Sequence, residues 1–225
     1  MPNTYRPLNK TMQTNLAPAQ FELLHCDEDI VVVNKPTDLL SVPGLASPQN
    51  LFDRVKAQFP TALVVHRLDM ATSGLMIFAL NKPAQSHLGK QFERRTIKKM
   101  YVAVVHGLVE QQSGEISSPL ICDWENRPKQ KVDWLHGKPA LTQYSVVDRN
   151  TAMQATRVHL FPHTGRSHQL RVHMQQIGHP IIGDYFYAPQ DADSCNSRLL
   201  LHAQTLNLSH PTSGANIHFD CPAPF

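Results

Sequence analysis

The stretch ALVVHRLDMATSGLMIFAL, residues 62–80, gives the clearest indication of the fold. Its two ends are apolar runs of strand length, which predict one strand ending at Val65 and another over residues 75–80. Between them, residues 69–74 combine an acid, two hydroxyl side chains and a glycine, which is typical of a tight turn. Asp69 is therefore expected in a rigid loop between two strands, with its carboxylate near the rim of a sheet.

The rest of the chain predicts more strands and a few short helices. Strands are expected on both sides of the acidic turn 26–29 and at residues 100–107, 141–149, 153–162, 199–208 and 216–222. Helices are expected over residues 50–59, from Pro83 to about residue 95, and over residues 167–177. Because strands and helices do not alternate strictly, we predict an α+β fold with a mixed, mostly antiparallel sheet flanked by helices and loops. Residues 1–20 are expected to be an N-terminal arm, and residues 21–225 a single domain.

Composition excludes several classes of protein. The 225 residues are 41% hydrophobic and 17% charged, which is enough apolar material for a folded core. No segment approaches the apolar length of a membrane span or of a signal peptide. The four cysteines are scattered and form no CxxC pair, which argues against a disulfide framework and a cysteine-rich zinc site and favours a reducing cytoplasm.

Basic residues gather in two places although the formal net charge is only +3. Such concentrations suit contacts with phosphates, but solvated charge on a helix and a loop explains them equally well. The candidates for phosphate contact are Arg94, Arg95, Lys98, Lys99, Arg127, Lys129 and Lys131.

The helix predicted over residues 167–177 has a polar face. His168, Arg171 and Gln175 share it, roughly opposite Leu170 and Met174. The guanidinium on this face can pair with a buried carboxylate and keep that carboxylate charged. The nearby histidines show no HxxxH spacing on one helix face and no acidic companions, so we expect no metal site.

Asp69 has a simpler interpretation when its spacing is considered alone. A turn-forming aspartate accepts hydrogen bonds from the backbone N–H groups of the residues that follow, here Thr72 and Ser73. Spacing alone favours this interpretation over a catalytic one.

Four blocks of sequence resemble, in the same order, the RluA-type RNA pseudouridine synthases. They are HRLDMATSGLMIFALNK (66–82), KKMYVAVVHG (98–107), HTGRSHQLRVHMQQIGHPIIGD (163–184) and LLLHA (199–203). The resemblance covers nearly the whole chain from residue 21. The loop ICDWENRPKQKV (121–132) resembles the branch of the family that modifies both 23S rRNA and a tRNA anticodon stem-loop. Many relatives carry an additional S4-type RNA-binding domain, for which there is no room before residue 21.

The resemblance implies a catalytic set of Asp69, Tyr101 and Arg171. Asp69 is the essential carboxylate, Tyr101 stacks on a flipped-out uracil or moves a proton, and Arg171 pairs with Asp69. Arg67 either enters the base stack that the uridine leaves or contacts a phosphate, and His168 is a further candidate for substrate binding. The reaction breaks the N1–C1′ bond and rejoins the base through C5. Because it changes no net redox state and imports no group, no cofactor is expected.

Three steps remain possible for the carboxylate: attack on C1′, addition to the pyrimidine ring, or removal of the ribose 2′ proton. Two other classes of function compete with the isomerase. One is an RNA-binding module that has kept the fold without the activity, and the other is a hydrolase of free nucleosides. Because the set of Asp69, Tyr101 and Arg171 is intact and no comparable motif contains the other acids, we favour an isomerase acting on structured RNA. The sequence contains no obvious coiled coil, so a monomer is expected.

Overall fold

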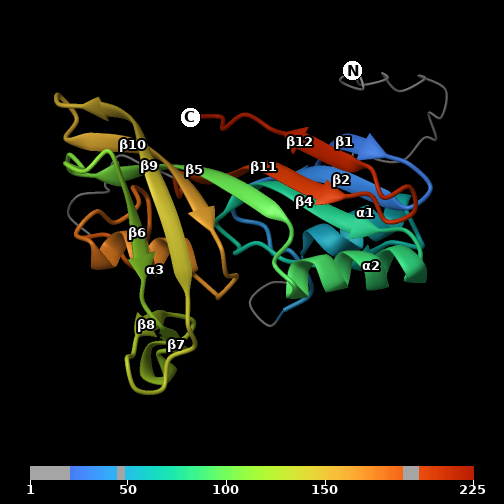
Figure 1. The fold of residues 1–225 in the computed structure, drawn as a ribbon, viewed down its shortest axis with the longest axis horizontal. Helices are drawn as coiled ribbons and strands as arrows, with labels where there is room; N and C mark the ends of the chain where they lie inside the picture. Colours follow the sequence, from blue (N-terminus) through green and yellow to red (C-terminus); the bar gives the residue numbers. More distant parts are fainter. Residues whose placement is uncertain (1–20, 45–48, 190–197) are drawn as a thin grey trace.

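The computed structural model describes residues 21–44, 49–189 and 198–225, so the expected N-terminal arm lies outside the described residues. Ten strands of the described chain form one long sheet in the order β1-β2-β4-β11-β5-β10-β9-β6, with β12 beside β11 and β3 beside β4 (Figure 1). The strands of this sheet are β1 (Glu22–Cys26), β2 (Ile30–Lys35), β3 (Leu63–Val64), β4 (Ser73–Ala79), β5 (Lys98–His106), β6 (Ser113–Ser117), β9 (Leu141–Asn150), β10 (Ala155–Pro162), β11 (Leu201–Ser209) and β12 (Asn216–Asp220). β7 (Leu120–Cys122) and β8 (Gln130–Val132) form a separate hairpin.

The predicted mixed sheet is confirmed. β11 pairs with β4 in parallel, and the other pairings in the sheet of the described chain are antiparallel. The helices are α1 (Leu51–Gln58), α2 (Lys82–Glu93), α3 (Gln169–Gln176) and the 3₁₀ turn η1 (Trp124–Asn126). Asn50 and Asn81 cap α1 and α2, because their side-chain oxygens accept the N–H groups of Asp53 and Ala84.

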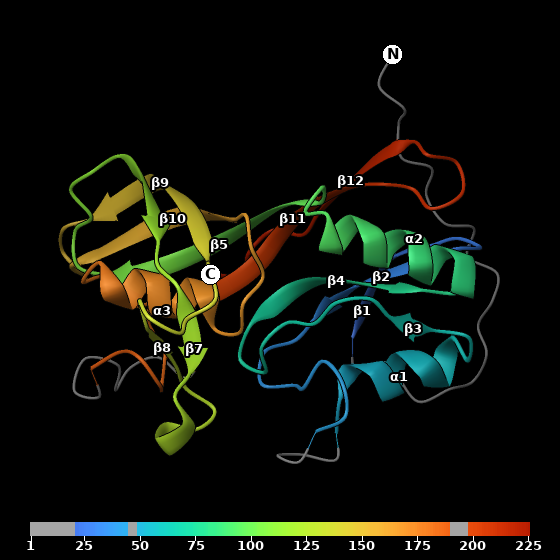
Figure 2. The same cartoon turned by 60° about the horizontal axis from the view of Figure 1, so that its bottom comes forward.

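β4 is buried along its whole length because helices cover both faces of its sheet. Leu75 and Ile77 pack in one cluster with α2, whereas Met76 and Phe78 pack in another cluster with α1. This is the period-two alternation of a strand with two covered faces. Figure 2 shows α1 and α2 on opposite sides of β2 and β4. The strand that leads out of the Asp69 loop is thereby fixed from both sides.

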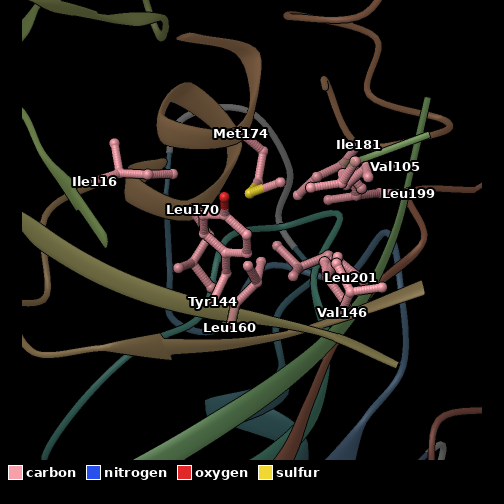
Figure 3. Close-up of a cluster of buried hydrophobic side chains, with 13 residues drawn as sticks. Val105, Ile116, Tyr144, Val146, Leu160, Leu170, Met174, Ile181, Leu199 and Leu201 are labelled. Atoms are coloured by element: carbon pink, nitrogen blue, oxygen red, sulfur yellow. The ribbon is translucent and has the colours of Figure 1, made fainter. Parts of the chain in front are cut away.

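α3 covers the other half of the sheet. Its residues Leu170 and Met174 pack onto Val105, Tyr144 and Leu160, which come from β5, β9 and β10 (Figure 3). The two halves of the sheet therefore have separate cores, and the strands β5 and β11 join them. The β3–β4 loop with Asp69 and the start of α3 with Arg171 face each other across this junction.

Gly74 makes this junction possible. Its φ is +112°, and a Cβ added there would lie 2.3 Å from the backbone oxygen of Ala203 on β11. Glycine is therefore required for β4 to pair with β11 immediately after the Asp69 loop.

We expect Gly74→Ala to lower the free energy of unfolding by about 3 kcal/mol, because a strained φ and a backbone clash act together. Denaturant unfolding measures this loss. The matched control is Gly89→Ala in α2, where an added Cβ meets nothing within 4 Å and the free energy of unfolding should rise by about 0.5–1 kcal/mol. Equal stability of wild type and Gly74→Ala would contradict the account of this junction.

Two predictions from the sequence need correction. The third helix begins at Gln169 rather than at residue 167, because His168 has a left-handed backbone with φ +52°. His168 is therefore not on the helix face with Arg171. No strand was predicted between residues 108 and 139, but this region contains the three short strands β6, β7 and β8. Only one residue of β6, Ile116, is buried, so the strand has no apolar period to be recognised by.

Candidate active site

A cavity of about 620 Å³ opens at the junction of the two halves of the sheet. Asp69, Tyr101 and Arg171 all line it, from the β3–β4 loop, β5 and α3. Its volume is in the range of pockets that hold small molecules. The fold thus brings together the three residues that the sequence predicts to be catalytic, although 102 positions separate the first from the last.

The Asp69 loop is held mainly through its backbone. The buried Lys35 donates from Nζ to the carbonyl oxygens of Pro36 (2.8 Å), Leu39 (2.6 Å) and Met70 (2.9 Å), and the last of these directly follows Asp69. Ser41 Oγ donates to the carbonyl of Leu68 at 2.7 Å and accepts from the backbone N–H of Leu68 at 3.0 Å. The residues on both sides of Asp69 are therefore fixed, as a reacting group requires.

The turn at Asp69 is closed by its backbone and not by its carboxylate, contrary to the simple turn interpretation. The Thr72 N–H donates to the backbone oxygen of Asp69 at 3.1 Å, not to its carboxylate. The side chain of Asp69 is 21% exposed and lines the cavity. The turn therefore uses the main chain of this residue and leaves the carboxylate to the site.

Arg171 lies between two carboxylates. Its Nε and NH2 bind Asp184 at 2.7 and 2.6 Å, whereas its NH1 is 3.9 Å from the Asp69 carboxylate. Burial works against the charge of Arg171, but the hydrogen bonds and charge of Asp184 outweigh it, so the pKa of Arg171 is raised. The expected pairing of Arg171 with Asp69 exists, but the tight partner is Asp184.

Asp184 was not among the site residues predicted from the sequence. It is the last residue of the block HPIIGD, directly after the buried Ile181 and Ile182 and a glycine. The only local sign of its importance was its position directly after two isoleucines and a glycine, which suggests a buried acid. Its side chain is fully buried, and it also accepts the backbone N–H groups of Phe186 and Tyr187.

Tyr101 keeps its phenolic proton. Burial raises the pKa of Tyr101 above its ordinary range, and the negative charge of Asp69 adds to the effect. At neutral pH the hydroxyl is therefore an O–H donor in the cavity, beside the carboxylate.

The predicted binding residues divide into two groups. Arg67, Arg95 and Lys99 line the cavity, together with Arg166, which sequence reasoning did not single out. Lys99 is half-buried, and burial lowers the pKa of its amine. The remaining predicted residues, which do not line the cavity, are His168, Arg94, Lys98, Arg127, Lys129 and Lys131.

His168 contacts an aromatic cluster behind Arg171. Its Nδ1 is 2.7 Å from the hydroxyl of Tyr187, and its ring stacks on Phe186 with centroids 5.8 Å apart. Burial lowers the pKa of His168. Both aromatic rings also lie about 5 Å from the guanidinium of Arg171, at 5.3 Å for Phe186 and 5.1 Å for Tyr187. His168 thus supports the arginine from behind.

Leu201 and His202 come from the last motif block. Leu201 lines the cavity, while the buried His202 binds Ser73 Oγ through Nδ1 (2.8 Å) and the Cys221 carbonyl through Nε2 (2.9 Å). His202 therefore packs beneath the site and does not line the cavity. In the described part of the chain no cluster of three or more His, Cys, Asp or Glu residues is arranged to hold a metal ion. In the same residues, no helix has the length and apolar character needed to cross a membrane.

Residues 29–176 match the family model described as RNA pseudouridylate synthase. The chain belongs to the RNA pseudouridylate synthase family. It is 54% identical over 206 residues to a dual-specificity RNA pseudouridine synthase RluA of Yersinia pestis, covering 90% of this chain and 99% of that protein. The protein of the same name in Escherichia coli K12 is 51% identical over 205 residues, or 90% of this chain and 93% of that protein.

Solved structures give the same family assignment. Human RNA Pseudouridylate Synthase Domain Containing 1 superposes with a TM-score of 0.80 at 29% identity, covering 95% of this chain and 87% of that one. Human RNA Pseudouridylate Synthase Domain Containing 4 gives 0.72 at 25% identity, with 90% and 88% covered. As a member of this pseudouridine synthase family, the chain is an isomerase that converts uridine to pseudouridine in RNA.

Lys35 gives a pH-dependent prediction for the Asp69 loop. Burial lowers its pKa in the folded protein to about 7, from an ordinary value of 10.5. Between these values the unfolded chain binds a proton at Lys35 that the folded chain does not bind. Raising the pH from 7 towards 10 should therefore stabilise the fold through this residue.

Denaturant unfolding at pH 7 and pH 9.5, for wild type and Lys35→Met, measures this contribution. The free energy of unfolding of wild type should rise with pH relative to that of Lys35→Met, because other titrating groups are common to both proteins. A parallel pH dependence of the two proteins would refute the assignment of the shift to Lys35.

Proposed function

We propose that the chain modifies uridines in 23S rRNA and in a tRNA anticodon stem-loop, with Asp69 as the essential carboxylate of the cavity. The observation that carries this proposal is the convergence of Asp69, Tyr101 and Arg171 on one cavity. The similar proteins named dual-specificity synthases support the assignment of two RNA substrates.

Asp69, Arg171 and Tyr101 have different roles in the isomerisation. The glycosidic N1–C1′ bond breaks, the uracil turns, and C5 bonds to C1′ and loses its proton, while the released N1 takes up a proton. Arg171 holds the Asp69 carboxylate at one edge of the cavity. Tyr101 presents a ring for the uracil and a protonated hydroxyl that can exchange a proton with the base.

The base must leave its stack to reach this cavity. Arg67, two residues before Asp69, is exposed where the cavity opens and is placed to fill the gap left by the uridine or to contact its phosphate. Arg95 and Arg166 also line the opening and supply positive charge for the backbone phosphates.

The outlying basic residues are proposed as further phosphate contacts. They are Arg94, Lys98, Arg127, Lys129 and Lys131, to which Lys99 adds a charge inside the cavity. His168 is proposed to act on the substrate only through Arg171, because it contacts Tyr187 and Phe186 rather than the cavity.

We infer that the protein acts as a monomer, because a single copy of the chain supplies all of the proposed catalytic residues. We infer a cytoplasmic location, since rRNA and tRNA are its proposed substrates.

Mapping pseudouridines in a strain that lacks the gene tests the substrates. One or more sites in 23S rRNA and one site in a tRNA anticodon loop should be lost, and purified protein should restore them on the extracted RNA. A strain complemented with the Asp69→Asn variant is the control and should restore none. Loss of sites in neither RNA would refute the proposed substrates.

A further inference from the structure

The β7–β8 hairpin, defined here as residues 120–138, exposes large apolar side chains. Both tryptophans of the chain are in it, and Trp124 is 66% and Trp134 72% exposed. Leu135, beside the second indole, is 83% exposed. Such a group of exposed apolar side chains is typical of a binding surface rather than of a solvated turn.

Some apolar side chains of the hairpin pack into the protein, whereas its two tryptophans do not. Leu120 and Val132 pack in a cluster with Val172 of α3 and with Tyr187. The backbone N–H of Gln130 also donates to the Tyr187 hydroxyl at 2.7 Å. Trp124 and Trp134 belong to none of the hydrophobic clusters of the described chain.

Hydrogen bonds nevertheless order both turns that carry a tryptophan, residues 123–129 at the tip and residues 133–137 after β8. The N–H of Asp123 donates to the Lys129 carbonyl at 2.9 Å, and the N–H of Lys129 donates to the Asn126 carbonyl at 3.0 Å. The carboxylate of Asp133 accepts the N–H groups of Leu135 (2.9 Å) and His136 (2.8 Å). The exposed indoles are therefore held on fixed turns, so little conformational entropy is lost when they bind a partner.

Arg127 lies over the indole of Trp124, with its guanidinium carbon 3.6 Å from the ring centroid. The guanidinium covers one face of the ring, and the large exposed fraction of Trp124 leaves the other available. A flat aromatic ring with a cation behind it is a suitable platform for a nucleobase. Stacking of unpaired bases on aromatic rings is also the usual way in which proteins bind single-stranded loops.

Charge favours RNA over a protein as the partner. The hairpin has four basic residues, Arg127, Lys129, Lys131 and Lys138, against three acids, Asp123, Glu125 and Asp133. Arg127 and Lys129 supply positive charge at the tip, whereas Lys131 is 3.4 Å from the Asp123 carboxylate and Lys138 lies beside Leu120 at the base. The hairpin packs on α3, beside which it lies in Figure 2, and the first residues of this helix line the cavity.

We propose that the exposed indole of Trp124, backed by Arg127, is a stacking site for an unpaired base of the RNA loop whose uridine enters the cavity. The inference rests on the proposed function, because it takes a stem-loop RNA as the substrate. It predicts that the hairpin distinguishes loops from continuous duplexes.

Intrinsic fluorescence gives a direct test, since the only two tryptophans of the sequence are in the hairpin. In a Trp134→Phe variant, Trp124 is the sole reporter. Titration with a tRNA anticodon stem-loop should quench its emission, whereas a blunt duplex of the same stem without unpaired bases should not. Equal quenching by both RNAs, or quenching by neither, overturns the proposal.

Kinetics supply the second readout. Trp124→Ala should raise KM for the stem-loop about tenfold with kcat nearly unchanged, since one base stack is lost. Trp124→Phe keeps a ring and should recover most of the affinity. Met153→Ala, which removes another exposed apolar side chain (70% exposed) in the β9–β10 turn, is the matched control and should leave KM unchanged. An unchanged KM in Trp124→Ala overturns the inference.

A separate assay tests the proposed RNA substrates. Tritium release by wild type from C5-labelled rRNA and tRNA tests the proposed function without reference to the hairpin. No release from either RNA would refute those substrates, while the fluorescence titration would still decide whether Trp124 stacks on unpaired bases.

Discussion

Asp69→Asn is expected to reduce turnover of uridine-containing RNA by about 10⁴-fold or more, because the amide cannot replace a carboxylate as nucleophile or base. RNA affinity should stay within about tenfold of wild type, since contacts to phosphates supply most of the binding. Single-turnover tritium release and a binding titration measure the two effects separately. The substitution is isosteric and the loop is held through its backbone, so the fold should be retained.

Asp148→Asn is a matched control, because Asp148 is an exposed carboxylate on β9 outside the cavity. It should keep full turnover. If Asp69→Asn instead unfolds the protein, Asp69 acts as a structural turn residue. If the variant keeps full turnover, the site has been assigned to the wrong carboxylate.

The buried pair of Arg171 and Asp184 gives the second large effect. Removing Asp184 alone, as Asp184→Leu, should lower the free energy of unfolding by about 3–5 kcal/mol, because a buried guanidinium loses its tight partner. Arg171→Met alone should cost a similar amount. The double variant should recover much of this loss, because apolar residues can replace a buried ion pair.

Activity measurements distinguish the catalytic role of Arg171 from the structural role of the Arg171–Asp184 pair. The double variant should remain inactive in the tritium assay despite its recovered stability, since Asp69 has lost the guanidinium 3.9 Å away. Denaturant unfolding of all four proteins gives the coupling energy. Additive losses of stability would show that the two side chains do not form an energetic pair, and an active double variant would remove Arg171 from the catalytic set.

Much of the fold could be predicted because its signals are local. The alternation along β4 and the β-branched run in β2 are visible in the sequence, and both strands were expected. The short strands β6–β8 were missed because they contain few buried residues. The start of α3 was misplaced because a left-handed residue, here His168, has no reliable signature unless it is glycine.

The site was predictable only through resemblance. Nothing local connects Asp69 with Tyr101 or Arg171, because the contacts depend on how β4, β11 and β5 pair. The true partner of Arg171 was missed for the same reason. Asp184 is 13 residues further along the chain, and a long-range pair of this kind cannot be read from spacing.

The most direct test of the account is the stoichiometry of the reaction. Purified protein is incubated with C5-tritiated stem-loop RNA in the presence of EDTA, and tritium release, pseudouridine and free uracil are measured together. We expect one tritium released for each pseudouridine formed, no free uracil, and neither tritium release nor pseudouridine with Asp69→Asn. Release of free uracil, or isomerisation that persists in Asp69→Asn, would contradict it.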